Sequence, residues 1–272
     1  MRIHFHKMEG AGNDFIVIDN FEYNFSIEQI ISMAPSLCDR KFGIGADGIM
    51  ALHPPQQDGL DYTMIYRNAD GSDAGMCGNG SRCLAVFAAN KGLGTSLSFN
   101  VHDAIYKAEV NGEYASISFP DVQQPKQISV QQQDLIQVFT GTEHVVSMDT
   151  AELLENENEL RKKGKSIRLD DTFSPNGTNV NFVCSHSDSK IQLQTFEKGV
   201  EDLTLACGTG AIAAAISSHH LHTPNSSSGD YTVQVKGGVL GISFNYDEQS
   251  KTYTNVYLNG PGTFVFEGYV EV

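Results

Sequence analysis

The chain has 272 residues and a formal net charge of −15, with 33 acidic and 18 basic side chains. This charge argues against nucleic acid or an anionic membrane surface as the partner, because both would repel it. No apolar run approaches the roughly 20 residues needed to span a bilayer, so no membrane partner is expected. The length fits one large domain or two ordinary ones.

The chain begins with a strand pattern, since polar and apolar side chains alternate over residues 1–6, and it lacks the apolar core of a signal peptide. A helix is predicted over 27–38, with Ser26 as its N-cap. The five cysteines are an odd number and no export signal accompanies them, which predicts reduced thiols in a cytoplasmic protein. They are Cys38, Cys77, Cys83, Cys184 and Cys207.

The first glycine-rich motif, Met76–Cys83, follows a strand-like stretch at 60–65 and leads into a helical run at 84–89. Hairpin patterns come next, with Asn111 and Gly112 as a turn signal. The strands predicted there cover 96–101, 105–110 and 115–119.

The middle of the chain is polar. Residues 120–133 are rich in proline and glutamine and are predicted to contain a domain boundary. A highly charged, helix-like stretch follows at 150–165, which we interpret as a solvated surface helix.

The second half repeats the order of the first. A strand at 190–195 precedes the motif Ala206–Ala211, and a helical run follows at 211–216. Strands are predicted at 231–235, 239–246 and 252–258, with Gly237 and Gly238 as a turn. The tail, 263–270, alternates cleanly and is expected to pair with another strand.

Each half therefore places a cysteine before Gly-x-Gly at the start of a helix. Tyr66 and Phe196 each stand eleven residues before the cysteine of their own half. The long period indicates a duplicated domain rather than a solenoid. A helix N-terminus presents unpaired N–H groups and the positive end of the dipole, a setting that lowers the pKa of a thiol. Two such sites suggest two matched thiols on either side of one substrate.

Seven motifs in this order give the chain a family resemblance over nearly its whole length. Together they resemble diaminopimelate epimerase, a cofactor-independent enzyme of lysine and peptidoglycan-precursor synthesis. The motifs are Gly10–Phe15, Gly43–Gly48, Asn68–Ser72, Met76–Gly80, Gly177–Asn179, Phe196–Gly199 and Ala206–Gly210.

The resemblance implies an α+β fold of two pseudo-symmetric lobes. Each lobe is expected to be a mainly antiparallel sheet or barrel wrapped around a central helix. Residues 1–121 and the strand 263–272 would form the first lobe, and residues 122–262 the second. The active site is expected in the cleft between the lobes, and the family resemblance also suggests a homodimer.

The implied reaction converts LL-diaminopimelate to meso-diaminopimelate, a small amino-acid substrate, without cofactor or metal. Inverting a Cα centre requires proton removal on one face and delivery on the other. Cys77 and Cys207 are assigned these roles, exchanged according to the direction of reaction. The backbone N–H groups of the following residues would stabilise charge on the α-carboxylate: Gly78, Asn79, Gly208 and Thr209.

The resemblance also suggests residues that select the substrate. Asn13, Asn68 and Asn179 would bind polar groups at its distal end. For each asparagine taken alone a turn or local cap is the favoured interpretation, but the motif context favours substrate binding for all three. Glu197 would bind an ammonium group or tune a cysteine, and His144 is the other candidate tuning residue. Lys198 would be the cation near a substrate carboxylate.

Four residues at three places in the chain depart from the family pattern. Lys198 stands where arginine is usual, which keeps the charge but loses the bidentate fork. Thr142 and Glu143 replace Asn-Pro in the sequence before His144, and Leu203 occupies a position that is commonly acidic. These changes leave the cysteine pair intact but alter the contacts expected for the distal carboxylate.

Other interpretations remain open. A related racemase of proline or hydroxyproline would typically carry histidine after the first Cys-Gly, where this chain has Asn79. A binding protein that kept the fold and lost activity is compatible with the departures above. A redox or metal site at Cys77 and Cys83 has the wrong spacing for Cys-x-x-Cys. The histidines of 219–222 could bind metal, but a solvated helix end is the simpler interpretation.

Overall fold

A computed structural model describes all residues, 1–272, which fall into two compact units. Unit 1 consists of Met1–Ser118 and Asn259–Val272, and unit 2 of Phe119–Leu258. The boundaries expected from the sequence lie a few residues from these. No helix is long and apolar enough to cross a membrane.

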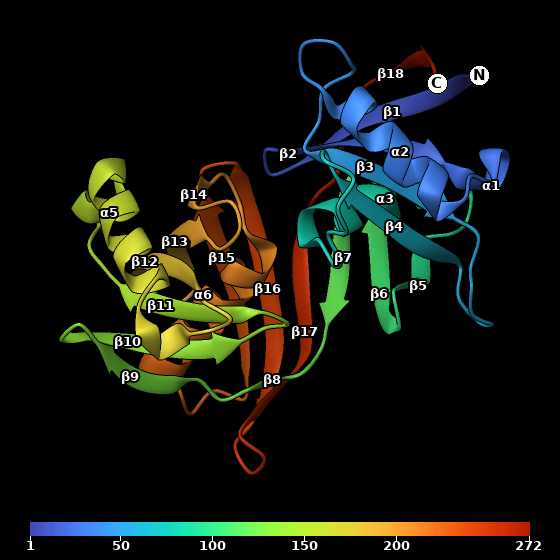
Figure 1. Cartoon of the computed structure of the whole chain (residues 1–272). Helices are drawn as coiled ribbons and strands as arrows, with labels where there is room; N and C mark the ends of the chain where they lie inside the picture. Colours follow the sequence, from blue (N-terminus) through green and yellow to red (C-terminus); the bar gives the residue numbers. More distant parts are fainter. The chain divides into compact units, whose positions relative to one another are not determined.

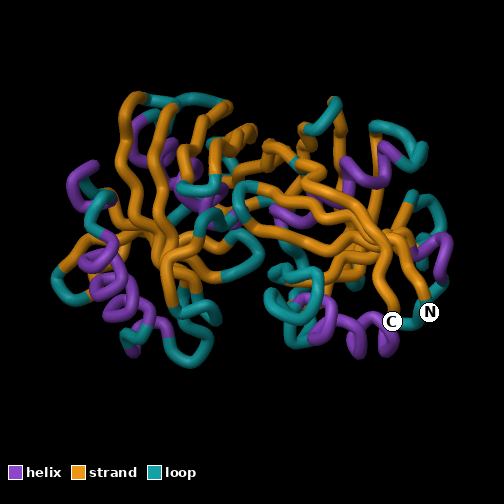
Figure 2. Tube along the Cα trace, turned by 90° about the horizontal axis from the view of Figure 1, so that it is seen from above, coloured by secondary structure: helices purple, strands orange, loops and turns teal.

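Unit 1 is built on a sheet in which the two ends of the chain lie side by side (Figures 1 and 2). Strand β18 pairs with β1 in antiparallel register, which supplies the partner expected for the alternating tail. The elements are β1 Arg2–Gly10, β2 Asn13–Asp19, α1 Asn20–Tyr23, α2 Ile27–Cys38, β3 Gly48–His53, β4 Tyr62–Asn68, α3 Gly78–Asn90, β5 Ser96–Val101, β6 Ala104–Asn111, β7 Tyr114–Phe119 and β18 Thr263–Glu271.

Unit 2 contains a second set of strands, with α5 packed on one side and α6 within it (Figure 1). The long strand β17, Thr252–Pro261, begins in unit 2 and ends in unit 1. The other elements are β8 Val122–Gln123, β9 Lys126–Val130, β10 Gln133–Phe139, β11 Glu143–Met148, α4 Ala151–Leu154, α5 Glu157–Arg168, a 3₁₀ turn Asp171–Phe173, β12 Asn179–Ser187, β13 Lys190–Glu197, β14 Asp202–Thr204, α6 Gly208–His222, β15 Ser228–Val235 and β16 Gly238–Asp247.

The two units repeat the same series of strand pairings. In unit 1, β1–β2 is antiparallel, β2–β3 parallel, β3–β4 antiparallel, β4–β5 parallel and β5–β6 antiparallel. In unit 2 the same alternation runs through β10, β11, β12, β13, β15 and β16. The duplication therefore begins three strands earlier in each half than the sequence pattern indicates.

The helix that follows each cysteine is buried along most of its length. In α3 every residue from Gly78 to Ala88 is buried, and α6 is buried from Gly210 to His219. Their sequences suit this position because they consist largely of alanine, glycine and other small or apolar residues, and a helix apolar on all sides belongs in a core. The α+β expectation of a central helix in each lobe is confirmed.

The local predictions are accurate where a cap marks the boundary. Helix α2 covers the predicted residues, and Ser26 forms a capping box with Gln29. The charged stretch after Thr150 differs from the prediction, because it forms two helices: α4 ends at Leu154 with Glu155 as its C-cap, and Asn156 caps α5.

The predicted linker at 120–133 also differs from the structure. It contains β8 and β9, because Val122 and Val130 are buried and draw the chain into unit 2. Its polar composition reflects the exposed side chains that alternate with these two.

Candidate active site

Both cysteines of the repeated motif occupy the N-cap of a buried helix in nearly the same backbone conformation. Cys77 precedes α3 with φ −119° and ψ 112°, and Cys207 precedes α6 with φ −125° and ψ 111°. The backbone N–H of Gly80 donates to Cys77 Sγ over 3.4 Å. The sequence duplication is thus a duplication of backbone geometry at the two cysteines.

The Cys77 thiol also contacts Asn13, the first residue of β2. The Sγ atom lies 3.7 Å from Asn13 Oδ1, and the Asn13 amide nitrogen donates to Asp47. The side chain predicted to bind substrate is therefore oriented by a carboxylate and presents its oxygen to the thiol.

A network of charged side chains holds the carboxylate of Asp47 next to Asn13. The buried Lys7 pairs with Asp14 at 2.5 Å, and Arg40 bridges Asp14 and Asp47 at 2.7 Å each. Burial opposes ionisation of Asp14, but hydrogen bonds from Arg40 and Lys7 hold its pKa well below the usual range. Asp14 therefore remains a carboxylate, which keeps the network charged and rigid.

Arg82 is a site feature that the sequence analysis did not identify. Its side chain is fully buried in α3, where Nη1 donates to the Gly78 carbonyl over 3.2 Å and Nε donates to Pro261 over 3.2 Å. The Nη2 atom is buried without a hydrogen-bond partner. Burial lowers the pKa of Arg82, whereas electrostatic interactions with Cys83, Cys77 and Glu9 act in the opposite direction. A buried cation thus lies beside the first turn of α3.

Two other predicted site residues of unit 1, Asn68 and Asn79, lie in a local turn and in the buried first turn of α3. Asn68, at the end of β4, donates its side-chain amide to Ser72 Oγ over 3.0 Å, and its backbone N–H bonds the Ser72 carbonyl. Asn79 is buried in the first turn of α3. Asn68 is therefore held in a local turn, as the simpler interpretation of that residue expects.

In unit 2 a chain of polar contacts connects His144 to Cys207. The side-chain amide of Asn181 donates to His144 Nδ1 over 3.0 Å, so the ring proton lies on Nε2. His144 Nε2 lies 3.0 Å from Thr209 Oγ1, which in turn lies 3.6 Å from Cys207 Sγ. With Nε2–H donating to the hydroxyl oxygen, the Thr209 hydroxyl proton can be directed at the sulfur.

His144 is neutral at physiological pH. Complete burial, together with the charge of Lys198, lowers its pKa to about 3, while the Asn181 hydrogen bond and Glu143 act weakly in the opposite direction. This agrees with the assigned tautomer. Any effect of His144 on Cys207 is transmitted by hydrogen-bond orientation rather than by a positive charge.

Two of the departures from the family pattern pair with each other. Lys198 Nζ lies 3.0 Å from Glu143 Oε2, and Asn176 donates to Glu143 Oε1 over 3.1 Å. The backbone N–H of Lys198 donates to Asn179 Oδ1 over 2.8 Å. Burial opposes ionisation of Glu143, but the hydrogen bond from Lys198 lowers its pKa. The lysine that replaces arginine thus has a carboxylate partner of its own.

Glu197 precedes Lys198 at the end of β13. Burial raises its pKa, and a hydrogen bond with Thr204 offsets part of that rise. Leu203, the third departure, faces Phe196 on the neighbouring strand and packs against the apolar core of unit 2. An apolar side chain at that position therefore has a packing role.

The remaining buried thiols differ from the two in the repeated motif. Burial raises the pKa of Cys38 to about 11 and that of Cys83 to about 12. Cys83 lies inside α3, and no residue of a metal cluster accompanies it. Both thiols are protonated at neutral pH.

A surface cavity of about 540 Å³ lies in unit 2, between β9, β10, β11 and Leu221 of α6. None of the predicted site residues lines it.

Comparison with known proteins identifies one family. The family model "Diaminopimelate epimerase" matches residues 5–115 and 136–265. A diaminopimelate epimerase of Flavobacterium psychrophilum is 38% identical over 264 residues, covering 96% of this chain and 98% of that protein. One of Aquifex aeolicus is 37% identical, covering 97% of this chain and 96% of that protein.

Solved structures show the same fold at low sequence identity. A Bacillus anthracis phenazine biosynthesis protein of the PhzF family has a TM-score of 0.77 at 13% identity, with both chains covered completely. A hydroxyproline epimerase of Agrobacterium vitis has a TM-score of 0.68 at 13% identity, covering 99% of this chain and 92% of that one.

Proposed function

This chain belongs to the diaminopimelate epimerase family, and from that premise we propose that it interconverts LL- and meso-diaminopimelate. The chain is accordingly an isomerase of amino-acid metabolism, and its product serves lysine and peptidoglycan-precursor synthesis. The observation that carries the proposal is the pair of cysteines, each capping a buried helix with the same backbone geometry.

We propose a two-base reaction. The thiolate of one cysteine accepts the α-proton, and the C–H electron pair delocalises into the α-carboxylate. The thiol of the other cysteine donates a proton to the opposite face of Cα and becomes the thiolate. For the reverse reaction Cys77 and Cys207 exchange roles, so the pair is the only acid and base that the reaction needs, with no cofactor or metal.

The helix N-termini would stabilise the charge that develops during proton removal. Backbone N–H groups at Gly78, Asn79, Gly208 and Thr209 belong to the first turns of α3 and α6. Such N–H groups are oriented before the reaction and gain most from an anion as it forms. This supports the assignment of the α-carboxylate, rather than the distal end of the substrate, to the helix ends.

We propose further that Asn13, Asn179 and Lys198 bind the distal amino-acid end of the substrate. Asn68 and Glu197 would contribute to the same contacts. Lys198 and Glu143 form an ion pair that offers one cation and one anion, which suits a substrate end carrying both an ammonium and a carboxylate. Homodimerisation remains part of the proposal, on the basis of the family alone.

The test is to incubate the full chain with LL-diaminopimelate in D₂O and to follow loss of the α-proton by NMR. Deuterium incorporation with formation of the meso isomer supports the proposal. L-Proline and trans-4-hydroxy-L-proline are run in parallel, since exchange in these alone would assign the protein to the other class of two-cysteine racemases. Absence of exchange in all substrates would indicate a binding protein.

A further inference from the structure

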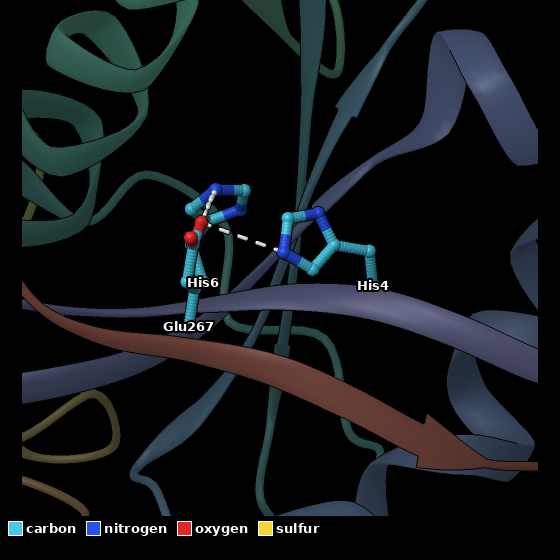
Figure 3. A group of neighbouring side chains, drawn as sticks. All are labelled: His4, His6 and Glu267. Atoms are coloured by element: carbon cyan, nitrogen blue, oxygen red, sulfur yellow. Dashed lines mark ion pairs between the residues drawn. The ribbon is translucent and has the colours of Figure 1, made fainter.

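Outside the proposed active site, one side-chain group in unit 1 gathers ligands that metals prefer. His4 and His6 alternate on β1 and therefore project from the same face of the sheet. In the antiparallel register His6 lies opposite Glu267 of β18. Figure 3 shows the two imidazoles directed at the same carboxylate.

The spacing of the ligand atoms is close to that of a zinc site. Glu267 Oε2 lies 2.9 Å from His6 Nε2 and 3.4 Å from His4 Nε2, and all three ligand atoms lie within 4.8 Å of one another. Zinc–ligand bonds of about 2.0–2.1 Å in a tetrahedron correspond to ligand–ligand distances of about 3.3 Å. Small side-chain rotations would bring all three atoms to that spacing.

Aromatic side chains hold both imidazoles in place. The His4 ring stacks on Tyr269 with centroids 4.7 Å apart, and the His6 ring packs against Phe87 at 4.9 Å and Phe264 at 5.8 Å. Rings already fixed by their neighbours lose little conformational freedom when they bind a metal.

The local charges admit a cation. Glu267 contributes one negative charge, and the nearby Lys91 is neutralised by Asp19 at 2.7 Å. Arg2 lies over the Tyr269 ring, 4.5 Å from its centroid. The Glu267 side chain is 64% exposed, so a metal and a water molecule can reach the open side of the cluster.

We propose that His4, His6 and Glu267 form a three-ligand site for Zn²⁺ that joins β1 to β18, with water as the fourth ligand. Two imidazoles and a carboxylate with one open position are a zinc ligand set. The bound ion would link residues near the two ends of the chain and stabilise unit 1. The proposal does not depend on the proposed epimerase activity.

The metal probe must be kept away from the catalytic thiols. Binding is therefore measured on the full chain carrying Cys77→Ala and Cys207→Ala. Co²⁺ is the spectroscopic probe, since its visible bands report tetrahedral geometry and thiolate ligands add an intense charge-transfer band. We expect one equivalent of Co²⁺ with tetrahedral bands and no thiolate band, displaced by Zn²⁺. Zn²⁺ should also raise the Tm, and EDTA should reverse the rise.

Ligand variants decide whether this cluster is the site. Glu267→Gln and His4→Ala should each weaken Zn²⁺ binding by at least about tenfold, whereas the double variant His220→Ala/His222→Ala should bind like its parent. Far-UV circular dichroism checks folding, and His4→Gln provides a second ligand variant if His4→Ala does not fold. Equal affinity in all variants, loss of binding in the His220/His222 control, or no saturable binding would overturn the proposal and leave an ordinary cross-strand ion pair.

Discussion

At the scale of single residues, the two thiols share a backbone geometry but differ in side-chain surroundings. Cys77 is contacted by the Gly80 N–H and the Asn13 amide oxygen, whereas Cys207 is contacted by the Thr209 hydroxyl. The two halves of a symmetric reaction therefore have unequal environments. This suits a substrate whose two configurations present different groups to the two sides.

Replacing either Cys77 or Cys207 with alanine should abolish the proposed epimerisation, because one face of Cα then lacks its proton donor or acceptor. Cys38→Ala is the matched control and should retain activity, since that thiol is buried and its pKa is raised to about 11. Cys184→Ala should also retain activity. Steady-state assays with both isomers measure this, and full turnover in Cys207→Ala would rule out the two-base assignment.

The same environments predict selective alkylation. Iodoacetamide at neutral pH should modify Cys77 and Cys207 before Cys38 or Cys83, whose raised pKa values keep them protonated. Diaminopimelate should protect the first pair. Peptide mass mapping against time measures the order of modification, and early labelling of Cys83 would contradict the assignment.

Arg82 should favour the thiolate of Cys77 through its buried positive charge. Arg82→Met removes the charge at similar length, so the midpoint of the pH profile for Cys77 alkylation should rise. Arg82→Lys should restore much of the wild-type profile because it keeps the charge. A merely structural role would lower the Tm of both variants without moving the alkylation midpoint, and that result would exclude the electrostatic role.

Lys198→Ala should lower kcat/KM for diaminopimelate by an amount equivalent to about 1.5–3 kcal/mol, the range for a hydrogen bond to a charged group. Lys198→Arg should lower KM or leave it unchanged. Glu143→Gln should raise KM, because it removes the carboxylate proposed to bind the distal ammonium group. Steady-state kinetics with both isomers measure all three variants. Wild-type kinetics in Lys198→Ala would show that this residue does not bind the substrate.

At the scale of elements, the first turns of α3 and α6 contain glycines with close neighbours. A Cβ at Gly80 would lie 1.5 Å from the Met50 methyl carbon, and one at Gly210 would lie 2.5 Å from Asn181 Oδ1. Gly210 therefore has a packing cause, whereas at Gly80 the close atom is the end of the flexible Met50 side chain, which can shift. Both glycines also belong to the helix ends that present N–H groups.

Gly210→Ala should destabilise the protein by about 1–3 kcal/mol, the usual cost of overpacking a core. It should also reduce kcat, since Asn181 orients His144 and through it Thr209. Urea unfolding and steady-state assays measure the two effects. Combining Gly210→Ala with Asn181→Ala should be less than additive in stability, and strict additivity would show that the clash with Asn181 is not the cause.

Elements with local signals could be predicted from the sequence. Helix α2 has a capping box at Ser26, and the two cysteine motifs mark the N-termini of α3 and α6. Residues 120–133 lie next to the boundary between the units but form β8 and β9 rather than an irregular linker, because two buried valines, Val122 and Val130, stand among polar residues. Of the strands that open each repeat, only β1 was predicted, from its alternation. The others were missed, because the parallel pairings β2–β3 and β11–β12 join segments that are separated along the chain.

The supporting residues of the site were harder to predict than the cysteines. Asn181 stands between Val180 and Phe182 in a buried strand, and Arg82 stands in the small-residue helix α3. A polar residue at a buried position of an element was the available signal. Its partner could not be deduced, because each contact depends on how the elements pack.

At the scale of the whole molecule, the buried neutral His144 should make folding sensitive to acid. Its pKa is about 3 when folded and about 6.5 when unfolded. Below pH 6.5, His144 therefore binds a proton in the unfolded chain but stays neutral in the folded chain. The free energy of unfolding contributed by this residue is complete above pH 6.5 and declines as the pH falls toward 3.

The expected loss from this residue between pH 6.5 and pH 5 is about 2 kcal/mol. Urea unfolding at the two pH values measures it, with His144→Gln as the control because glutamine stays neutral. The contributions of all other ionisable groups are the same in both proteins and cancel in the comparison. The slope of stability against pH should be shallower in His144→Gln, and equal slopes would contradict a buried neutral His144.

Each unit of the duplicated chain supplies one capped thiol, and the proposed reaction needs both on one Cα. The most direct test follows deuterium in each isomer during the first turnovers of LL-diaminopimelate in D₂O. With two opposed thiols, newly formed meso isomer should carry deuterium at the inverted centre, because a different group delivers the new proton. Recovered LL isomer should remain protiated. Deuterium appearing equally early in recovered LL isomer, or product that retains the substrate's own hydrogen, would contradict two opposed thiols and indicate a single base.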